Sequence, residues 1–225
     1  MPTYYRNESL FSEIYLQEVS EQNQSRDALA ALQVLADYRT FADPSSLLAW
    51  QRSYVHQVLS ALGFAVVPRT SALTELFRMG ETVHDGPLSL CCALLPEENL
   101  DNTTMGRNWA EKIIRALRES HLRWGLLTNG KQWRIYHLDE PKPYETYLEM
   151  DLEGILKDRA QDAFQIFYKF MRAENFEIRE EGKCRFDLFK QESQQKIDYI
   201  ETELTQALKQ REEGGKGVLS DLCMG

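Results

Sequence analysis

The sequence lacks the segments and loops that most directly assign a protein to a class. No run of twenty apolar residues occurs, so we expect no transmembrane helix. The start, MPTYYRNESLFSE, has neither the basic nor the apolar region of a secretory signal. GxxxxGKS/T, GxGxxG and GxSxG are also absent. These absences argue against a P-loop, a dinucleotide-binding loop and a hydrolase nucleophile elbow.

Cysteine and histidine, the usual zinc ligands, are sparse as well. The chain has four cysteines, of which only Cys91 and Cys92 lie close together, and four scattered histidines. No CxxC, HxxxH or HExxH spacing occurs, so neither a zinc site nor histidine-based metal catalysis is indicated. This pattern favours reduced, mostly buried thiols, and we therefore expect a cytoplasmic protein.

Positive charge is in the minority. The 26 Lys and Arg face 35 Asp and Glu, which gives a net charge of −9. This balance argues against nucleic-acid binding by the whole surface, although it is compatible with a local basic groove. Hydrophobic residues make up 43% of the 225 residues, enough for one large domain with helical extensions.

The most strongly patterned segment present is RWGLLTNGKQWRIYHL, residues 123–138. Two aromatic-rich runs flank Asn129-Gly130. A two-residue Asn-Gly loop favours the type I′ turn, because both central residues need positive φ. The segment predicts a hairpin with strands at 124–128 and 132–138.

The remaining elements predict an α/β fold with a mixed sheet. The run LSLCCALL, 88–95, is almost wholly apolar, as is typical of a central strand covered on both faces. The middle strands are linked too tightly for parallel crossovers, so the sheet must be mixed. We expect further strands at 64–67, 73–79 and 145–150, one helix between Asp43 and Gly63, and another that starts at Thr103 or Thr104.

The order helix, three strands, helix, strand resembles the PD-(D/E)xK nuclease core. WGLLTNGKQWRIY is similar to the "GxLTNGxxWRLY" strand pair of the N-terminal nuclease domains of type IIG restriction–modification enzymes. Type I restriction subunits carry a similar pair. ENLDN (98–102), LFSEIYLQE near the start and VLSALGF (58–64) resemble other segments of that family, in the family's order.

The resemblance covers about residues 8–210 and implies a domain plan. Helices at 1–42 would precede a restriction-endonuclease-like core at 43–180, a mixed sheet flanked by helices. A long, narrow-striped helix would form a C-terminal connector at 187–225.

The resemblance also implies that the catalytic site is degenerate. In such nucleases an Asp on one strand and a Glu-x-Lys on the next hold Mg²⁺ and position water. Matching ENLDN to the family's "VEAK…NLD" segment puts the Glu position at Cys92 and the Lys position at Leu94, and the Asp position falls at Leu73. A thiol is a poor Mg²⁺ ligand, and leucine can neither ligate nor donate. The resemblance thus favours a non-catalytic domain without a cofactor.

An alternative is a relocated Mg²⁺ site in an active DNA endonuclease. Glu75 follows Leu73 by two residues and so shares its strand face; a register slip of two would place it at the Asp position. The candidates for such a site are Glu75, Glu97, Glu98 and Lys112.

Two kinds of partner are expected. Under the degenerate-nuclease reading, the chain is a scaffold or DNA-contacting module of an anti-phage or restriction–modification system. It would be fused or docked to a DNA methyltransferase or specificity module through 187–213. Its phosphate contacts would position the DNA without reading its sequence. The candidate DNA-binding residues are Arg107, Lys112, Arg115, Arg118, Arg123 and Lys131. A pure protein-interaction subunit is a further alternative, motivated by the acidic charge and the C-terminal helix.

Overall fold

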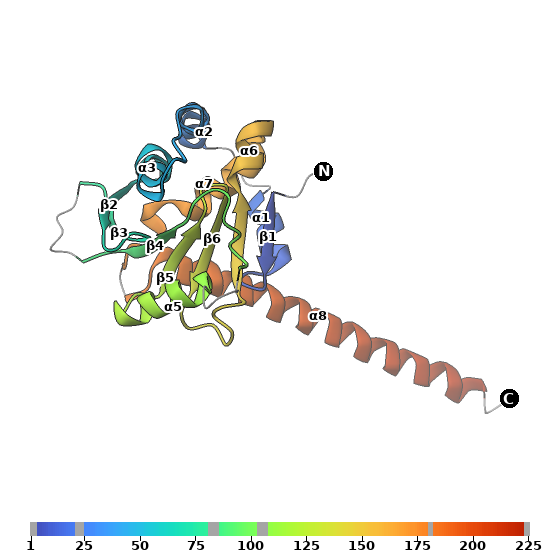
Figure 1. The fold of residues 1–225 in the computed structure, drawn as a ribbon. Coiled ribbons are helices and arrows are strands. Elements are labelled where there is room, and N and C mark those ends of the chain that lie inside the picture. Colours follow the sequence, from blue (N-terminus) through green and yellow to red (C-terminus); the bar gives the residue numbers. More distant parts are fainter. Residues whose placement is uncertain (1–3, 21–24, 81–85, 103–107, 180–181, 223–225) are drawn as a thin grey trace.

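A mixed seven-stranded sheet forms the centre of the molecule (Figure 1). The structure is a computed structural model and describes residues 4–20, 25–80, 86–102, 108–179 and 182–222, with side chains in the last helix to residue 208. The strand order is β1-β7-β6-β5-β4-β3-β2. β4 and β5 are parallel, and the other neighbouring pairs are antiparallel. The predicted α/β fold with a mixed sheet is confirmed.

The strands follow the predicted order, with one addition at the start of the chain. β1, which pairs with β7 at one edge of the sheet, was not expected among the N-terminal helices. The strands are β1 (Tyr5–Glu8), β2 (Phe64–Pro68), β3 (Leu73–Arg78), β4 (Ser89–Ala93), β5 (Trp124–Thr128), β6 (Gln132–His137) and β7 (Tyr147–Asp151).

Helices cover both faces of the sheet (Figure 1). The helix expected between Asp43 and Gly63 is divided by a π-helical turn, and its cap is Ser46, whose hydroxyl accepts from the Ala49 amide. The helical elements are α1 (Glu13–Ser20), α2 (Arg26–Thr40), α3 (Leu47–Trp50), η1 (Gln51–Val55), α4 (His56–Ala61), α5 (Trp109–Glu119), α6 (Leu152–Asp158), α7 (Gln161–Met171), η4 (Ala173–Asn175) and α8 (Arg185–Leu222).

α5 begins at Trp109, later than its sequence predicted. The Asn108 side chain accepts a hydrogen bond from the Glu111 amide at 3.0 Å and has an extended backbone, so it caps the helix there. The expected start at Thr103 or Thr104 lies outside the described residues.

The two sheet faces carry two apolar clusters. The larger cluster packs α1, α2, α4, α7 and the start of α8 on one face. The smaller packs α5 on the other. Successive residues of β4 alternate between them: Cys91 belongs to the larger cluster and Cys92 to the smaller. Gly125 lets α5 approach, since a Cβ there would lie 2.9 Å from a Leu117 methyl carbon.

The hairpin is confirmed, but the predicted turn type is wrong. Thr128 pairs with Trp133, so 129–132 form the loop, and of this Asn-Gly pair only Gly130 has positive φ, +84°. The Asn129 side chain explains the difference. Its Oδ1 accepts from the Lys131 and Gln132 amides at 3.0 and 2.9 Å, an Asx-type turn that needs no left-handed asparagine.

α8 begins against the body and then leaves it (Figure 1). Phe186, Phe189 and Ser193 are buried, whereas every residue from Glu201 to Leu208 is exposed. No helix within the described ranges combines the length and the apolar character needed to cross a bilayer.

Candidate functional site

One row of side chains crosses the sheet on the face that α5 covers. Each residue of the row is the direct cross-strand neighbour of the next, and such neighbours point to the same face. From β3 to β1, this cross-strand row consists of Leu73, Cys92, Leu127, Arg134, Glu149 and Arg6. Its β3–β5 half is apolar and its β6–β1 half is charged.

The apolar half contains the positions at which the sequence resemblance places the metal site. Leu73 lies directly opposite Cys92, and both are buried with Leu94 in the cluster beneath α5. Burial raises the pKa of the Cys92 thiol to about 12, with Lys112 opposing this shift and Glu98 adding to it. The thiol is therefore protonated at neutral pH, and a protonated thiol is a poor nucleophile.

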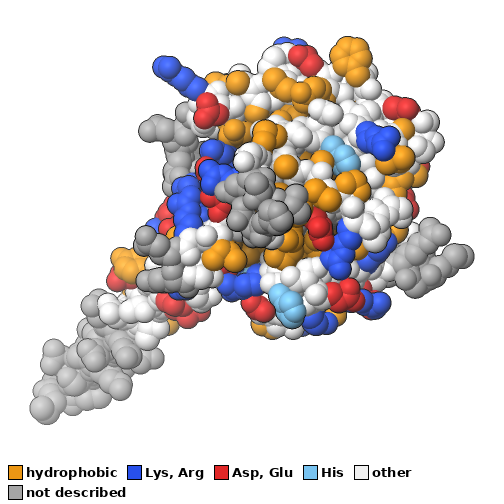
Figure 2. All heavy atoms as spheres, turned by 90° about the vertical axis from the view of Figure 1, so that its left-hand side faces the viewer, with side chains coloured by type: hydrophobic (Ala, Val, Ile, Leu, Met, Phe, Trp, Pro, Cys, Tyr) orange, Lys and Arg blue, Asp and Glu red, His pale blue; other side chains and the backbone are white. Residues whose placement is uncertain are grey.

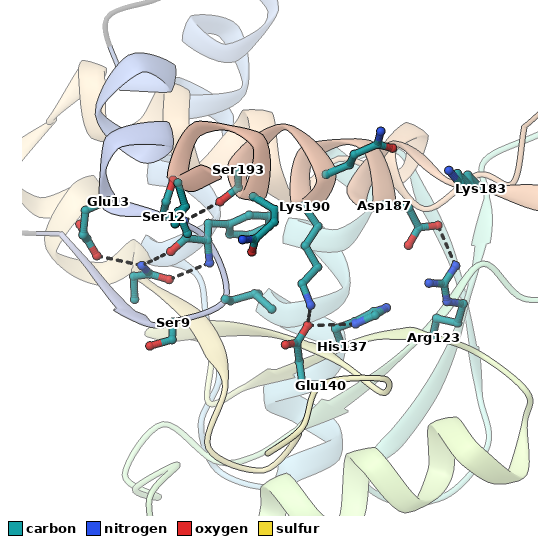
Figure 3. Close-up of a pocket in the computed structure, with 16 residues that line it drawn as sticks. Ser9, Ser12, Glu13, Arg123, His137, Glu140, Lys183, Asp187, Lys190 and Ser193 are labelled. Carbon is teal, nitrogen blue, oxygen red and sulfur yellow. Dashed lines mark hydrogen bonds and ion pairs between the residues drawn. The ribbon is translucent and has the colours of Figure 1, made fainter. Parts of the chain in front are cut away.

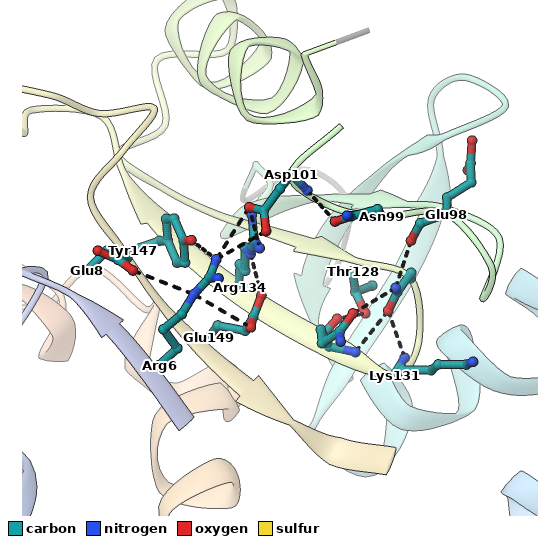
Figure 4. A network of polar contacts seen from close by, with 12 residues as sticks. Arg6, Glu8, Glu98, Asn99, Asp101, Thr128, Lys131, Arg134, Tyr147 and Glu149 are labelled. Carbon is teal, nitrogen blue, oxygen red and sulfur yellow. Dashed lines mark hydrogen bonds and ion pairs between the residues drawn. The ribbon is translucent and has the colours of Figure 1, made fainter. Parts of the chain in front are cut away.

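The charged half is organised around Arg134 (Figure 4). Only 4% of its side chain is exposed. Its Nε donates to Glu149 Oε2 at 2.5 Å, and its Nη2 lies 2.7 Å from Asp101 Oδ1. Burial opposes the charge, but Tyr136 and Glu149 more than offset this effect and raise the pKa of Arg134. The guanidinium also lies 4.3 Å from the centre of the Tyr147 ring.

Arg6 closes the network from the edge strand. It donates to Asp101 Oδ1 at 3.3 Å and to the Tyr147 hydroxyl, and its Nε lies 3.9 Å from Glu149. Asp101 thus bridges two arginines from β1 and β6, and Figure 4 shows both of them joined to its carboxylate. These carboxylates already have cationic partners, so the arrangement holds the loop after β4 on the sheet and offers no vacant ligand set for a metal.

The ENLDN loop is also held by the hairpin. Asn129 Nδ2 donates to the Glu98 carbonyl at 2.9 Å. The Glu98 carboxylate accepts from the Leu95 amide at 3.2 Å, and Asn99 Oδ1 accepts from the Asp101 amide at 2.9 Å. Two of the segments that resemble the nuclease family therefore contact each other directly.

Among the residues considered for a relocated metal site, Glu75 and Glu98 lie towards opposite ends of β4. Glu75 lies opposite Leu90 and 4.0 Å from Arg69, whose guanidinium donates to Ser120 at the C-terminal end of α5. Glu98 turns back on Leu95, past the other end of β4. Of the remaining two candidates, Glu97 is exposed, and the Lys112 ammonium lies 4.9 Å from the centre of the Trp109 ring. Within the described ranges, no group of three or more His, Cys, Asp or Glu could hold a metal ion.

The basic residues considered for DNA contact fall into two groups. Lys112, Arg115 and Arg118 project from α5, and Arg115 is paired with Glu111 at 2.7 Å. Arg123 and Lys131 are paired with acids: Arg123 lies 3.0 Å from both Asp139 and Asp187, and Lys131 lies 3.7 Å from Glu153. Arg107 lies outside the described residues. Figure 2 shows charges of both signs interspersed with apolar side chains over the face at the β2 edge.

A cavity of about 670 Å³ lies between the start of α8, the segment after β1 and the end of β6 (Figure 3). Glu140 sits between the ammonium of Lys190 and His137 Nδ1, the latter at 3.1 Å. Burial, with Lys190 and Arg123, lowers the pKa of His137 to about 4. Asp187 accepts from Arg123 and from the Trp124 indole. These contacts fasten α8 to the sheet.

Sequence reasoning missed the arginine–carboxylate network. The signal for it is weak: Arg134 is one charge between the aromatic and apolar residues Trp133, Ile135 and Tyr136. The other members of the network come from β1, β7 and the loop after β4, and only the sheet order brings them together.

Comparisons with known proteins return no match. No family model fits the chain, and neither the curated proteins nor the solved structures contain a significant relative.

Proposed function

We propose that this chain is a non-catalytic, restriction-endonuclease-like module that acts as a scaffold in an anti-phage or restriction–modification system. The Leu73–Cys92 pair carries the proposal. These positions were assigned from two separate segments, and they prove to be direct cross-strand partners on one face. Two metal-binding acids on adjacent strands would need that placement.

The chemistry at those positions supports the absence of catalysis. Leu73, Cys92 and Leu94 are packed against Ile113 and Leu117 of α5, where an ionised group would be costly to bury. Apolar packing on one half of the row and arginine–carboxylate pairs on the other hold the strands together.

DNA contact is the second part of the proposal and belongs to the outer face of α5. Lys112, Arg115 and Arg118 are three residues apart and so follow one side of the helix. Such a stripe would make weak, sequence-independent phosphate contacts. Target recognition would come from a fused or docked methyltransferase or specificity module. The three described cysteines are buried and unpaired, as suits the cytoplasm.

A cleavage assay tests the catalytic half of the proposal. The purified chain is incubated with plasmid and phage DNA in Mg²⁺ or Mn²⁺. We expect no cleavage above the level given by the matched Glu75→Ala variant. Cleavage that Glu75→Ala or Glu97→Ala abolishes would establish an endonuclease with a relocated site and overturn the proposal.

Salt-dependent binding tests the DNA half. Fluorescence anisotropy with a labelled duplex should show weak binding at low salt that falls steeply as salt rises. Arg115→Ala/Arg118→Ala should reduce the affinity at least threefold, whereas the control Lys157→Ala on α6 should not. An absence of binding at low salt would exclude DNA contact and leave a protein-binding scaffold.

A further inference from the structure

The outer part of α8, from Glu201 to Leu208, does not pack against the described body of the protein. Side chains are buried on α8 only as far as Ser193, and Ile197 and Ile200 are half-buried. From Glu201 to Leu208 all are exposed, and Figure 1 shows the helix extending away from the sheet. Isolated helices are marginally stable in water, and most helices in proteins are stabilised by packing. The segment from Glu201 to Leu208 has no such packing against the described body.

One side of this segment is apolar. Ile197, Ile200, Leu204 and Leu208 are spaced by three or four residues and follow one face of a helix. Leu204 is 59% exposed and Leu208 62% exposed. Burying such side chains in a complex is favourable by about 25 cal/mol per Å² of apolar surface.

Acidic residues border this stripe on both sides. At 100° per residue, Glu201 falls beside Leu208 on one margin and Glu203 falls on the opposite margin. Residues 197–208 contain Asp198, Glu201 and Glu203 but neither Lys nor Arg, so the segment carries a charge of −3.

These margins disfavour a second copy of the same segment. In a parallel pair the Glu201 margin of one helix would face the Glu203 margin of the other. In an antiparallel pair each margin would face its own equivalent. Both arrangements place carboxylates against carboxylates, whereas a helix with basic margins would place opposite charges together.

We propose that residues 197–208 of α8 form a docking face for a partner helix that carries an apolar stripe bordered by Lys or Arg. The inference rests on the proposed scaffold function, because it names the chemistry of the partner that the connector holds. Its test uses neither DNA nor metal, so its failure is distinguishable from a failure of that function.

Two designed helical peptides with the same apolar stripe, one with Lys and one with Glu at both margins, serve as probes. Anisotropy with the full chain should show at least tenfold tighter binding of the Lys peptide. Leu204→Gln should weaken this binding about tenfold. Glu201→Lys/Glu203→Lys should reverse the preference, so that the Glu peptide binds more tightly.

The matched control is Thr202→Lys/Gln206→Lys, which adds positive charge on the opposite face of the same segment and should preserve the preference. Circular dichroism checks that all variants remain folded. Equal binding of both peptides, binding of neither, or a control that also reverses the preference would overturn the proposal. So would a dimer in light scattering that Leu204→Gln dissociates, because a second copy would then be the occupant.

Discussion

Cys92 lies in the middle of the cross-strand row, opposite Leu73 and beneath α5. A small apolar side chain there should preserve the fold, whereas a carboxylate would be buried without a partner. We expect Cys92→Ala to lower the free energy of unfolding by about 1 kcal/mol and Cys92→Glu to lower it by several times that amount, as measured by urea denaturation. A stable Cys92→Glu protein that gains Mg²⁺ affinity would show that the site had kept room for a metal.

Arg134 is the residue of the row whose charge is most deeply buried. Replacing it leaves Glu149 without its closest partner. Arg134→Ala should therefore destabilise the fold by about 3–5 kcal/mol. The control is Arg6→Ala: with 44% of the Arg6 side chain exposed, its loss should cost about 1 kcal/mol or less. Equal effects of the two changes in urea denaturation would show that burial does not set the strength of this network.

His137 makes stability depend on pH at the base of α8. It is packed on Trp124 and surrounded by Lys190, Arg123, Asp139, Glu140 and Asp187. Its folded pKa, about 4, is below the ordinary 6.5, so the unfolded chain takes up a proton first as pH falls. The contribution of neutral His137 to the free energy of unfolding is therefore fully present above pH 6.5. It is lost as the pH falls towards 4, by up to about 3 kcal/mol.

The His137→Asn variant checks this expectation. Urea denaturation between pH 6.5 and 4 should show a shallower loss of stability in the variant than in the unchanged protein. Identical slopes would mean that the carboxylates alone cause the acid sensitivity.

At the scale of elements, the 123–138 hairpin depends on one glycine. Gly130 has φ of +84°, and a Cβ at this position would overlap the Trp50 ring. Gly80 has a similar φ, +91°, but open space around it. Gly80→Ala should cost about 1–2 kcal/mol through the backbone alone, and Gly130→Ala about 1–3 kcal/mol more through the clash. Equal costs in thermal or urea unfolding would show that Trp50 can move aside.

The sequence predicted the elements with strong local patterns and missed those that depend on tertiary contacts. Leu88–Leu95 and the hairpin strands were predictable, because apolar content and an Asn-Gly pair are local signals. β1 was not, since YRNE has no strand pattern and is held by pairing with β7. The turn type failed because Asn129 bonds to its own loop and to Glu98.

For the whole molecule, the sheet order decides what the candidate site can do. It places Leu73 opposite Cys92, and it brings Asp101 and Glu149 to Arg134, with Arg6 joining Asp101 from the edge strand. The family resemblance that assigns these two positions stays a prediction. The sequence could not predict the arginine–carboxylate network, because its members come from β1, β6, β7 and the loop after β4, which are far apart in the chain.

Isothermal titration of Mg²⁺ and of Mn²⁺ into the purified chain tests the proposal of a non-catalytic core most directly, with Glu75→Ala as the control. Because the side chains at positions 73, 92 and 94 are apolar, we expect no binding of either ion with a Kd in the micromolar-to-millimolar range. The Glu75→Ala variant should give the same result. Binding in that range which Glu75→Ala abolishes would contradict this prediction and establish a metal site in the protein.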